Sequence, residues 1–506
     1  MPIRSMFTFA FLLIFAWISA QGEDCEQLTK LAVPSATIWS AILVPAGDFH
    51  PQGAGQPSSP VPTFCQIKAS LTPSSDSDIE VELWLPLAGA WNKRLLGTGN
   101  GGFAGKIDYL ALAGGVRDGY AVANTDMGMK VPAGQDQSIF IDHPERWADW
   151  GFRSTHGMTE FAKQIIQAYY GQAPAHSYFK GCSTGGEQAL MEAQRFPDDY
   201  DGILGGAPAN NRVPLHISIL WNFAQGHTDA ESWLPPEKIA LLSKAVTEKC
   251  DPIDGLKDGL ISDPEKCSFD PSSLVCIDKD SSECLTRAQV GTVKRIYAGP
   301  VNQRTGRNIY QGLSKGSEYA WVGFMGQSFQ PGIAAPFAPI FQWVFGRDWN
   351  WRTFDYDRDA ERMNEQLGPP LNADDTNLEP FRVRGHKLLL YHGWADRLVP
   401  PQETIDYYHA VAAKEGVATN DFFRLFLLPG VEHCSNGIGP DSFDGLAALV
   451  RWVEQGVAPA RLIATRYRTS DSKDLLERPL CPYPNVDRYI GRGYPEKEAS
   501  FVCAHP

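Results

Sequence analysis

The chain has 506 residues, more than one ordinary compact domain holds unless a core fold carries a large insertion. Its formal net charge is −14 and it has no basic run, which argues against nucleic-acid binding. A hydrophobic content of 43% is typical of a soluble globular chain.

Residues 1–20 have the pattern of a secretory signal peptide. Arg4 precedes the apolar run "FTFAFLLIFAWI" at residues 7–18, which is too short to span a bilayer. Ser19 and Ala20 then offer a small-residue cleavage site. An N-terminal anchor or a buried helix is the alternative. Because no later stretch has the pattern of a membrane span, we expect a mature protein that is secreted, either extracellular or periplasmic.

In an oxidising compartment, the ten cysteines are interpreted first as disulfides. Connectivity does not follow from sequence alone, but short spacings suggest local pairs. The suggested pairs are Cys25 with Cys65, Cys250 with Cys267, Cys276 with Cys284, and Cys481 with Cys503. Cys182 and Cys434 remain, far apart in the chain.

Strand and helix patterns alternate over the first part of the chain. "IEVELWLP" from Ile79 alternates apolar and polar residues, as strands do, and "NKRLLGTGNGGFAG" predicts a strand that ends in a glycine-rich turn. A third strand, "GYAVANTDMG", is followed by the helix pattern "GMTEFAKQIIQAYYG". The strand "HSYFKG" and the helix "GGEQALMEAQRF" come next. This order predicts an α/β fold with a mostly parallel sheet.

The alternation stops at about Ala207 and resumes after Val383. The intervening segment is rich in Trp, Phe and Pro. After it come the strand patterns "HKLLLYHGWAD" and "DFFRLFLLPG" and the amphipathic helix pattern "DGLAALVRWVEQG". We therefore predict a catalytic core of residues 21–206 and 384–506, split by an inserted lid domain of residues 207–383. Two consecutive domains are the alternative. The aromatic runs "WVGFMGQSF" and "FQWVFGRDWNW" either line the substrate site or form the core of the lid.

Ser183 lies in a Gly-x-Ser-x-Gly pattern between a predicted strand and a predicted helix. Small residues on both sides allow the tight turn that presents a nucleophilic serine in α/β-hydrolases, although the five-residue pattern alone is weakly specific. The base and its orienting acid follow in the order Ser, acid, His, each after a strand. Asp396 in "HGWADRLVPP" and His433 in "GVEHC" fit that order. His392 is the second candidate for the base, although it precedes the acid.

An oxyanion formed at Ser183 needs backbone N–H donors. The amide after the nucleophile, that of Thr184, is one predicted donor. The glycine-rich turn "GTGNGGFAG" predicts the second, from Gly101 or Gly102. An ordinary glycine turn without a catalytic role is the alternative.

Cys182 precedes Ser183, and Cys434 follows His433. If Ser183 and His433 lie within hydrogen-bond reach, their neighbours are close enough for a disulfide that would join the nucleophile loop to the base loop. A thiol nucleophile at Cys182 is less compatible with the turn, which directs residue 183 at the substrate. Two unrelated cysteines are the third possibility.

The predicted lid contains an acidic loop, "CDPIDGLKDGLISDPEKC", at residues 250–267. Closely spaced carboxylate and carbonyl oxygens suit Ca²⁺, although the spacing is not that of an EF-hand. The candidate ligands are the side chains of Asp251, Asp254 and Asp258 and the backbone oxygens of Leu256 and Leu260. A solvated acidic turn is the alternative on spacing alone.

Together these motifs resemble the tannase and feruloyl esterase family. The resemblance rests on "YFKGCSTGGEQALMEAQRFPDDYDGILGGAPA", "YHGWADRLVPP", the His-Cys pair at 433–434, "CDPIDGLKDGLISDP" and "GNGGFAG". It implies an α/β-hydrolase core with a lid, a Ser-His-Asp triad, a disulfide between the triad-adjacent cysteines and a structural Ca²⁺ in the lid. Glu187, Glu432 and the "SNG" after Cys434 differ from what is usual in that family.

The expected function is therefore that of a secreted serine carboxylesterase. Its substrates would be small aromatic esters, or plant polyphenol or polysaccharide esters, of phenolic acids such as gallic or ferulic acid. The alternatives are a terephthalate half-ester hydrolase on the same fold, a serine peptidase, a catalytically inactive binding protein and a redox protein that uses Cys182. Internal repeats, which would support a propeller-bearing peptidase, are not found in the sequence.

Overall fold

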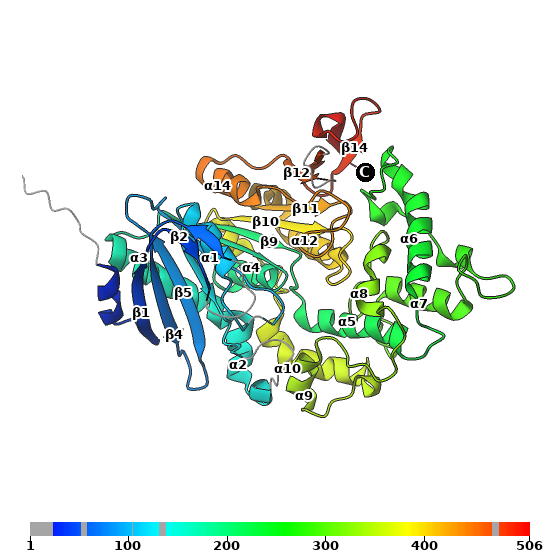
Figure 1. Cartoon of the computed structure of the whole chain (residues 1–506), viewed down its shortest axis with the longest axis horizontal. Helices are drawn as coiled ribbons and strands as arrows, with labels where there is room; N and C mark the ends of the chain where they lie inside the picture. The colour runs from blue at the N-terminus through cyan, green and yellow to red at the C-terminus, as the bar shows by residue number, and fades with distance from the viewer. Residues whose placement is uncertain (1–23, 52–57, 104, 131–137, 468–474, 506) are drawn as a thin grey trace, which may run out of the picture.

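The computed structural model describes residues 24–51, 58–103, 105–130, 138–467 and 475–505, so the predicted signal peptide lies outside the described residues. Its core is a nine-stranded sheet with helices on both faces (Figure 1), which confirms the predicted α/β class. In spatial order the strands are β1 (Ala36–Val44), β4 (Phe64–Leu71), β5 (Ile79–Pro86), β7 (Ala121–Thr125), β6 (Arg94–Thr98), β8 (His176–Cys182), β9 (Gly202–Gly206), β10 (Lys387–Gly393) and β11 (Phe423–Leu428).

The sheet has an antiparallel part and a parallel part. β1, β4, β5 and β7 pair antiparallel, whereas every neighbouring pair from β7 to β11 is parallel. Successive side chains of the central strands point to opposite faces, and on β8 Tyr178 and Phe179 are both fully buried in different apolar clusters. Burial on both faces explains the near-continuous apolar sequence of these strands.

Five helices cover the sheet. The apolar clusters place two of them, α1 (Tyr109–Arg117) and α14 (Gly445–Gln455), on one face. The other face is covered by α3 (Ser154–Tyr170), α4 (Thr184–Arg195) and α12 (Pro401–Glu415). Three short helices connect these elements: α2 (Pro144–Ala148), α11 (Glu379–Val383) and α13 (Thr419–Phe422).

The chain between β9 and β10 forms helices that lie beside and below the sheet in Figure 1. They are α5 (Arg212–His227), α6 (Pro236–Cys250), α7 (Arg287–Ala298), α8 (Val322–Met325), α9 (Ala338–Phe345) and α10 (Arg358–Leu371). One apolar cluster belongs to this segment alone. A second joins it to the core, because Phe140 and Trp150 pack with Ile217 and Trp343. The helical segment is thus packed firmly against the core.

The two aromatic runs of this segment mostly form its interior. Trp321 and Phe341 are fully buried, and Trp343 stacks on Phe140 with ring centroids 4.8 Å apart. Neither run contributes to the wall of the pocket at Ser183, which instead includes Phe337, just before the second run. Of the two interpretations, that of a lid core describes these runs.

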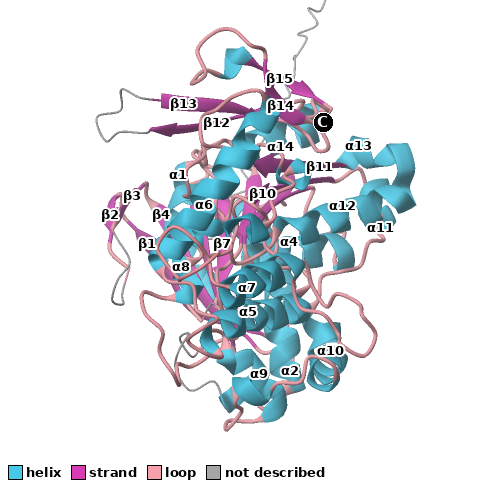
Figure 2. Cartoon of the chain, turned by 90° about the vertical axis from the view of Figure 1, so that its right-hand side faces the viewer, coloured by secondary structure: helices cyan, strands magenta, loops and turns pink. Residues whose placement is uncertain are grey.

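Small hairpins complete the fold. β2 (Gly47–Phe49) pairs with β3 (Ser59–Val61), and two hairpins lie at the C-terminal end of the chain (Figure 2): β12 (Leu462–Tyr467) with β13 (Leu475–Leu480), and β14 (Val486–Tyr489) with β15 (Phe501–Ala504). Among the described residues, no helix combines the length and apolar character needed to cross a membrane. Disulfides join Cys25 to Cys65, Cys182 to Cys434, Cys250 to Cys267, Cys276 to Cys284, and Cys481 to Cys503, the pairs that were predicted.

Candidate active site

Ser183 occupies a tight turn between the end of β8 and the start of α4. Its backbone lies in the left-handed region, with φ 66° and ψ −117°, and its N–H donates to the Gly206 carbonyl at 2.9 Å. A Cβ atom added at Gly181 would lie 2.5 Å from the Gly185 carbonyl oxygen, so the turn closes only with glycine there. The flanking glycines therefore let the strand enter the helix and leave the hydroxyl of Ser183 at a pocket.

Ser183, His433 and Asp396 form one chain of hydrogen bonds. His433 Nδ1 lies 2.7 Å from Asp396 Oδ2, and because a carboxylate only accepts, this nitrogen carries the proton. In the neutral ring, Nε2 is then an acceptor, and it lies 2.7 Å from Ser183 Oγ. The serine hydroxyl thus donates to a base whose tautomer is fixed by a buried acid, the arrangement that activates a serine nucleophile.

Asp396 is fully buried, but its surroundings favour the ionised carboxylate. Burial alone would raise its pKa, but the positive charge available on His433, with hydrogen bonds from His392 and His433, holds the pKa well below its ordinary value. The amides of Leu398 and Val399 donate to Oδ1 at 2.8 and 2.9 Å. The loop after β10 thereby fixes the carboxylate toward His433.

His392, the second candidate for the base, does not contact Ser183. Its Nε2 donates to the Val399 carbonyl at 2.9 Å and lies 3.2 Å from Asp396 Oδ2, while Nδ1 accepts from Thr404 Oγ1 at 2.8 Å. The ring is fully buried behind the acid. His392 therefore supports Asp396, and its position excludes it as the base for Ser183.

The glycine-rich turn after β6 is bonded to the start of α4. The Gly185 amide donates to the Asn100 carbonyl at 2.8 Å, and the Asn100 amide donates to Gln188 Oε1 at 2.9 Å. Thr184 Oγ1 donates to the Gly102 carbonyl at 2.6 Å. These bonds bring Gly101 and Gly102 to the pocket wall beside Ser183, with Thr184 as the first residue of α4. This placement is compatible with the predicted oxyanion donors.

The pocket at Ser183 has a volume of about 280 Å³ and mostly apolar walls. The core contributes Ser183 and His433, the glycine turn and Leu398 and Val399. Helix α5 contributes a second part of the wall. Its residues there are Arg212, Leu215, His216 and Ile219, and Phe337 adds an aromatic ring. A small, largely apolar cleft with few polar groups is typical of a small-molecule site.

Arg212 joins this wall to the nucleophile's helix. Its guanidinium binds Glu187 on α4 through Nε, at 2.8 Å, and through Nη2, which also donates to Thr184 Oγ1 at 2.9 Å. Burial raises the pKa of Glu187 to about 7, an effect that the charge of Arg212 opposes. Glu187, unusual for the family that the sequence resembles, thus has a partner in this chain. Hydrogen bonds therefore connect α5, through Arg212, to Thr184 and from there to the Gly102 carbonyl.

The Cys182–Cys434 disulfide joins the loops of Ser183 and His433, with Cα atoms 5.9 Å apart. Because both sulfurs are bonded to one another, Cys182 is not available as a second nucleophile or as a redox-active thiol in this state. Both cysteines line the pocket. The bridge therefore supports the predicted position of the base relative to the nucleophile.

The acidic loop at residues 250–267 gathers like charges. Burial and the neighbouring aspartates raise the pKa of Asp251 and Asp254. The Gly259 amide donates to Asp251 at 3.0 Å, and Ser262 Oγ donates to Asp254 at 2.9 Å. Asp258 is already paired with Arg478, but Asp251 and Asp254 are partly buried carboxylates that repel one another, and such oxygens suit a hard cation, so these two residues fit Ca²⁺ in kind.

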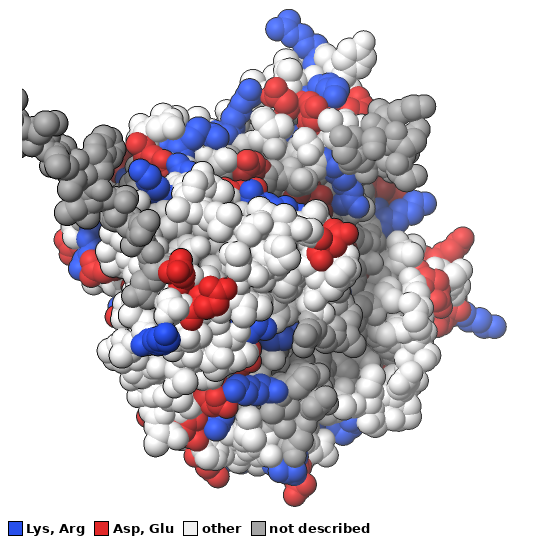
Figure 3. Space-filling model, turned by 60° about the vertical axis from the view of Figure 1, so that its left-hand side comes forward, with Lys and Arg blue, Asp and Glu red and all other residues white. Residues whose placement is uncertain are grey.

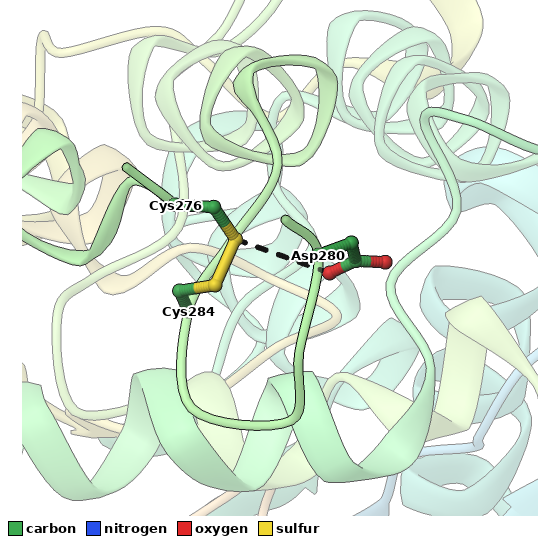
Figure 4. Close-up of side chains that lie close together, drawn as sticks. All are labelled: Cys276, Asp280 and Cys284. Atoms are coloured by element: carbon green, nitrogen blue, oxygen red, sulfur yellow. Dashed lines mark hydrogen bonds between the residues drawn. A yellow bond between two sulfur atoms is a disulfide. The ribbon is translucent and has the colours of Figure 1, made fainter. Parts of the chain in front are cut away.

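Among the described residues, two groups of possible ligand atoms converge, and neither includes the aspartates of the acidic loop. Cys276, Asp280 and Cys284 form the first (Figure 4), but the two sulfurs are joined in a disulfide, which removes their capacity as thiolate ligands. His156, Glu192 and Asp199 form the second. In it His156 Nδ1 lies 2.6 Å from Asp199 Oδ2, and Lys163 Nζ lies 3.7 Å from the same carboxylate, so existing partners satisfy Asp199.

A sequence profile described as "Tannase and feruloyl esterase" matches residues 65–504. The chain belongs to the tannase and feruloyl esterase family. It is 36% identical to an uncharacterized esterase of Xanthomonas campestris, over 99% of this chain and 94% of that one. It is 34% identical to a probable feruloyl esterase of Arthroderma benhamiae, over 96% of this chain and 94% of that one.

Solved structures place this member of the tannase and feruloyl esterase family in the same fold. The crystal structure of feruloyl esterase B from Aspergillus oryzae superimposes with a TM-score of 0.86 at 31% identity, over 95% of this chain and 99% of that one. Tannin acyl hydrolase from Aspergillus niger gives 0.77 at 21% identity, over 94% and 92%, which supports the fold alone. The chain is a carboxylic ester hydrolase of this family.

Two site residues of this esterase were not predicted from sequence. Arg212 and His216 lie one helical turn apart at the start of α5, directly after "GGAPANN". Helical spacing puts both on one face, but only the packing of α5 against the core shows that this face lines the pocket. No motif marks them in the sequence.

Proposed function

We propose that this esterase hydrolyses esters of phenolic acids, as a feruloyl esterase or tannase does, through the triad Ser183, His433 and Asp396. The observation that carries the proposal is the continuous hydrogen-bond chain from Asp396 through His433 to Ser183 at an apolar pocket. The relatives named as feruloyl esterases and the family profile, described as tannase and feruloyl esterase, support the substrate class.

In the proposed reaction, Ser183 Oγ attacks the ester carbonyl as His433 Nε2 takes its proton. Asp396 holds the ring and stabilises its charged form. The amide of Thr184 and that of Gly101 or Gly102 bind the developing oxyanion. His433 then returns the proton to the leaving alcohol, which leaves an acyl-enzyme. Water, activated by the same histidine, releases the aromatic acid and regenerates Ser183.

The pocket favours an uncharged aromatic acyl group over a terephthalate half-ester. A half-ester carries a free carboxylate, which needs a cation or several donors where it is bound. Among the described residues of the wall, Arg212 is the side chain with a permanent positive charge, and it is already bonded to Glu187. The half-ester hydrolase remains the second candidate within this fold.

An ester panel and one substitution test the proposal. Methyl ferulate, methyl caffeate and methyl gallate are expected to be hydrolysed, and Ser183→Ala should lower kcat by at least 10³-fold, since the nucleophile is lost. A terephthalate half-ester and a peptide anilide test the rival activities. Turnover of the anilide alone would favour a peptidase, and absence of all turnover in the wild type would favour a binding protein.

We also propose that the mature enzyme is secreted and acts on plant polyphenol or polysaccharide esters outside the cell. The apolar run at residues 7–18 and the five disulfides support export. Expression with residues 1–20 present, followed by N-terminal sequencing of protein from the medium or periplasm, tests this. Intact Met1 on cell-retained protein would contradict it.

A structural Ca²⁺ in the acidic loop is a further part of the proposal. Asp251, Asp254 and Asp258, with the carbonyls of Leu256 and Leu260, would hold it, and the ion would offset their mutual repulsion. A chelator should then lower the Tm by a few degrees, and Ca²⁺ but not Mg²⁺ should restore it. Asp254→Asn should abolish this response, whereas Asp278→Asn, at an exposed position outside the loop, should keep it. An unchanged Tm after verified chelation would argue for a solvated acidic turn.

A further inference from the structure

His216 brings an imidazole ring into the pocket wall from α5. It is 2% exposed and lines the same cavity as Ser183. None of the steps of ester cleavage described above uses it. On the same wall Leu215 and Ile219 are apolar and Arg212 is already bonded to Glu187, so the imidazole is the polar group of α5 that remains for a ligand.

The protonation of the His216 ring follows from one hydrogen bond. Nδ1 lies 2.8 Å from the Arg212 carbonyl oxygen, which can only accept, so Nδ1 carries the proton. In the neutral ring, Nε2 is therefore a bare acceptor. Within the described part of the chain, the hydrogen bond of this ring is made at Nδ1, which leaves Nε2 to a ligand in the pocket.

Neighbouring rings hold this acceptor in place. Phe337 meets the imidazole edge to face, with centroids 5.3 Å apart and planes at 82°, and Phe103 lies 5.8 Å away on another side. Phe337 also lines the pocket. Together with the bond to Arg212, these contacts restrict rotation of the ring, so the direction of the Nε2 lone pair is set before any ligand binds.

The ring also stays uncharged over the range in which esterases work. Burial, with the adjacent charge of Arg212, lowers the pKa of His216 to about 3. A neutral imidazole cannot act here as a cationic clamp for a carboxylate. It can accept a hydrogen bond from a ligand that donates one.

Ester substrates differ in whether they carry such a donor near the acyl group. The ester carbonyl and the alkoxy oxygen only accept, and methoxy groups on an aromatic ring do the same. A phenolic hydroxyl is a strong donor joined to a flat apolar ring, which matches a polar point set in apolar and aromatic walls.

We propose that His216 Nε2 accepts a hydrogen bond from a ring hydroxyl of the acyl group and so selects phenolic over non-phenolic aromatic esters. This inference rests on the proposed function and adds a residue that discriminates among its substrates. A site whose buried acceptor is left unpaired by a ligand binds that ligand less well. His216 is therefore a specificity residue, and Ser183 cleaves esters without it.

The test uses ester pairs that differ in one group. Methyl 4-hydroxycinnamate and methyl 3-hydroxycinnamate offer a donor at two ring positions, methyl cinnamate lacks the hydroxyl, and methyl 4-methoxycinnamate keeps the size without the proton. In the wild type, we expect kcat/KM for one hydroxylated ester to exceed that for methyl cinnamate at least tenfold. His216→Leu should reduce this ratio to near one, mainly through a loss of kcat/KM for the hydroxylated ester.

Two variants control for general damage to the pocket. His216→Gln places an amide oxygen near the former Nε2 position and should restore part of the preference. Ile219→Leu alters the same wall without touching the acceptor and should keep the preference. A ratio that His216→Leu leaves unchanged, or a wild type without preference, would overturn the assignment.

A binding measurement separates the failure of this assignment from that of the proposed function. In Ser183→Ala protein, calorimetry should show tighter binding of the preferred hydroxycinnamate ester than of methyl cinnamate, and His216→Gln can be measured if His216→Leu does not fold. Equal binding of the two esters, with ester turnover by the wild type intact, refutes the role of His216 alone. A wild type without any ester turnover refutes both.

Discussion

Asp396 is the residue on which the geometry of the site depends most. One oxygen accepts from two backbone amides of its own loop, and the other faces both His433 and His392. A fully buried carboxylate with these donors remains charged, because its pKa is held low by the same groups. Its charge fixes the proton on His433 Nδ1 and leaves Nε2 free to accept from Ser183.

Asp396→Asn tests this dependence. The amide can donate to His433 Nδ1 and favour the wrong tautomer, so we expect kcat on methyl ferulate to fall roughly 10³- to 10⁴-fold with little change in KM. Thermal melting by circular dichroism checks that the variant is folded. Activity within tenfold of the wild type, in folded protein, would show that Asp396 does not set the tautomer.

At this scale, local sequence was sufficient to select Ser183, Asp396 and His433, which the structure brings together, and insufficient for their surroundings. Ser183 and His433 could be predicted because tight turns after strands leave recognisable short motifs. His392 and His433 each follow a strand pattern, and only the tertiary contact to Ser183 separates the two. The positions of Arg212 and His216 depend on how α5 packs against the core, which no local pattern encodes.

At the level of the elements, a covalent bond joins the loop after β8 to the loop after β11. The Cys182–Cys434 bridge spans 252 positions in sequence and lies beside both the nucleophile and the base. Constraining so long a loop in the unfolded chain stabilises the fold by up to about 5 kcal/mol in the chain-entropy estimate. The same bond restricts movement of His433 relative to Ser183.

Removing this bridge should therefore affect stability and catalysis together. For the Cys182→Ala/Cys434→Ala variant, we expect a lower Tm and a loss of kcat/KM of at least tenfold at a temperature where the protein is still folded. Cys276→Ala/Cys284→Ala, which opens a bridge spanning 8 positions far from the triad motifs, is the matched control and should keep its activity. Equal activity of the two double variants would contradict a positioning role for the Cys182–Cys434 bond.

The predicted elements cover most of the parallel part of the sheet and less of its antiparallel part. β10 and β11 are largely apolar and β8 has a short apolar centre, each is bounded by turns, and the sequence patterns located them. β1, β4, the central strand β9 and the small hairpins were not predicted, and three of the five residues of β9 are glycine. β1 exposes much of its length and pairs on one side only, so its pattern is weak, and the hairpins near the C-terminus are held by a disulfide and by Arg478, which binds Asp258 of the acidic loop.

For the whole molecule, the charged groups of the surface and the carboxyl groups buried in the interior have different effects. On the face shown in Figure 3, Lys and Arg lie scattered among Asp and Glu, with broad uncharged areas between them. Inside, burial raises the pKa of several carboxyl groups to about 7: Asp126, Glu187, Glu318 and Glu403. The folded protein therefore holds protons that the unfolded chain releases near pH 4.

Stability should consequently decline as the pH rises from about 5 to above 7. An acid whose pKa is raised in the folded state stabilises that state fully below its unfolded pKa and loses the effect as the pH passes through the folded value. A single fully buried group contributes up to about 3 kcal/mol in this way. We expect the Tm to be several degrees lower at pH 8 than at pH 5, measured by calorimetry in matched ionic strength.

Glu318→Gln isolates the contribution of one buried acid to this pH dependence of stability. Glu318 is fully buried and accepts from Tyr297 and from the Gly316 amide, and the amide side chain mimics its protonated form. The difference in Tm between this variant and the wild type should grow in favour of the variant from pH 5 to pH 8. The exposed Glu365→Gln on α10 should show a constant difference, and the same constancy in Glu318→Gln would contradict the buried-acid explanation.

The Cys182–Cys434 bond also makes a covalent ring of the chain from residue 182 to residue 434, and that ring contains every helix from α5 to α11. A protease that cuts the backbone once within this stretch would open the ring without releasing either half of the active site. The nicked enzyme would run as one species on a non-reducing gel and as two fragments after reduction. In a habitat rich in proteases, such a bond would allow the lid to be cleaved once while Ser183 and His433 stay on the same covalent framework.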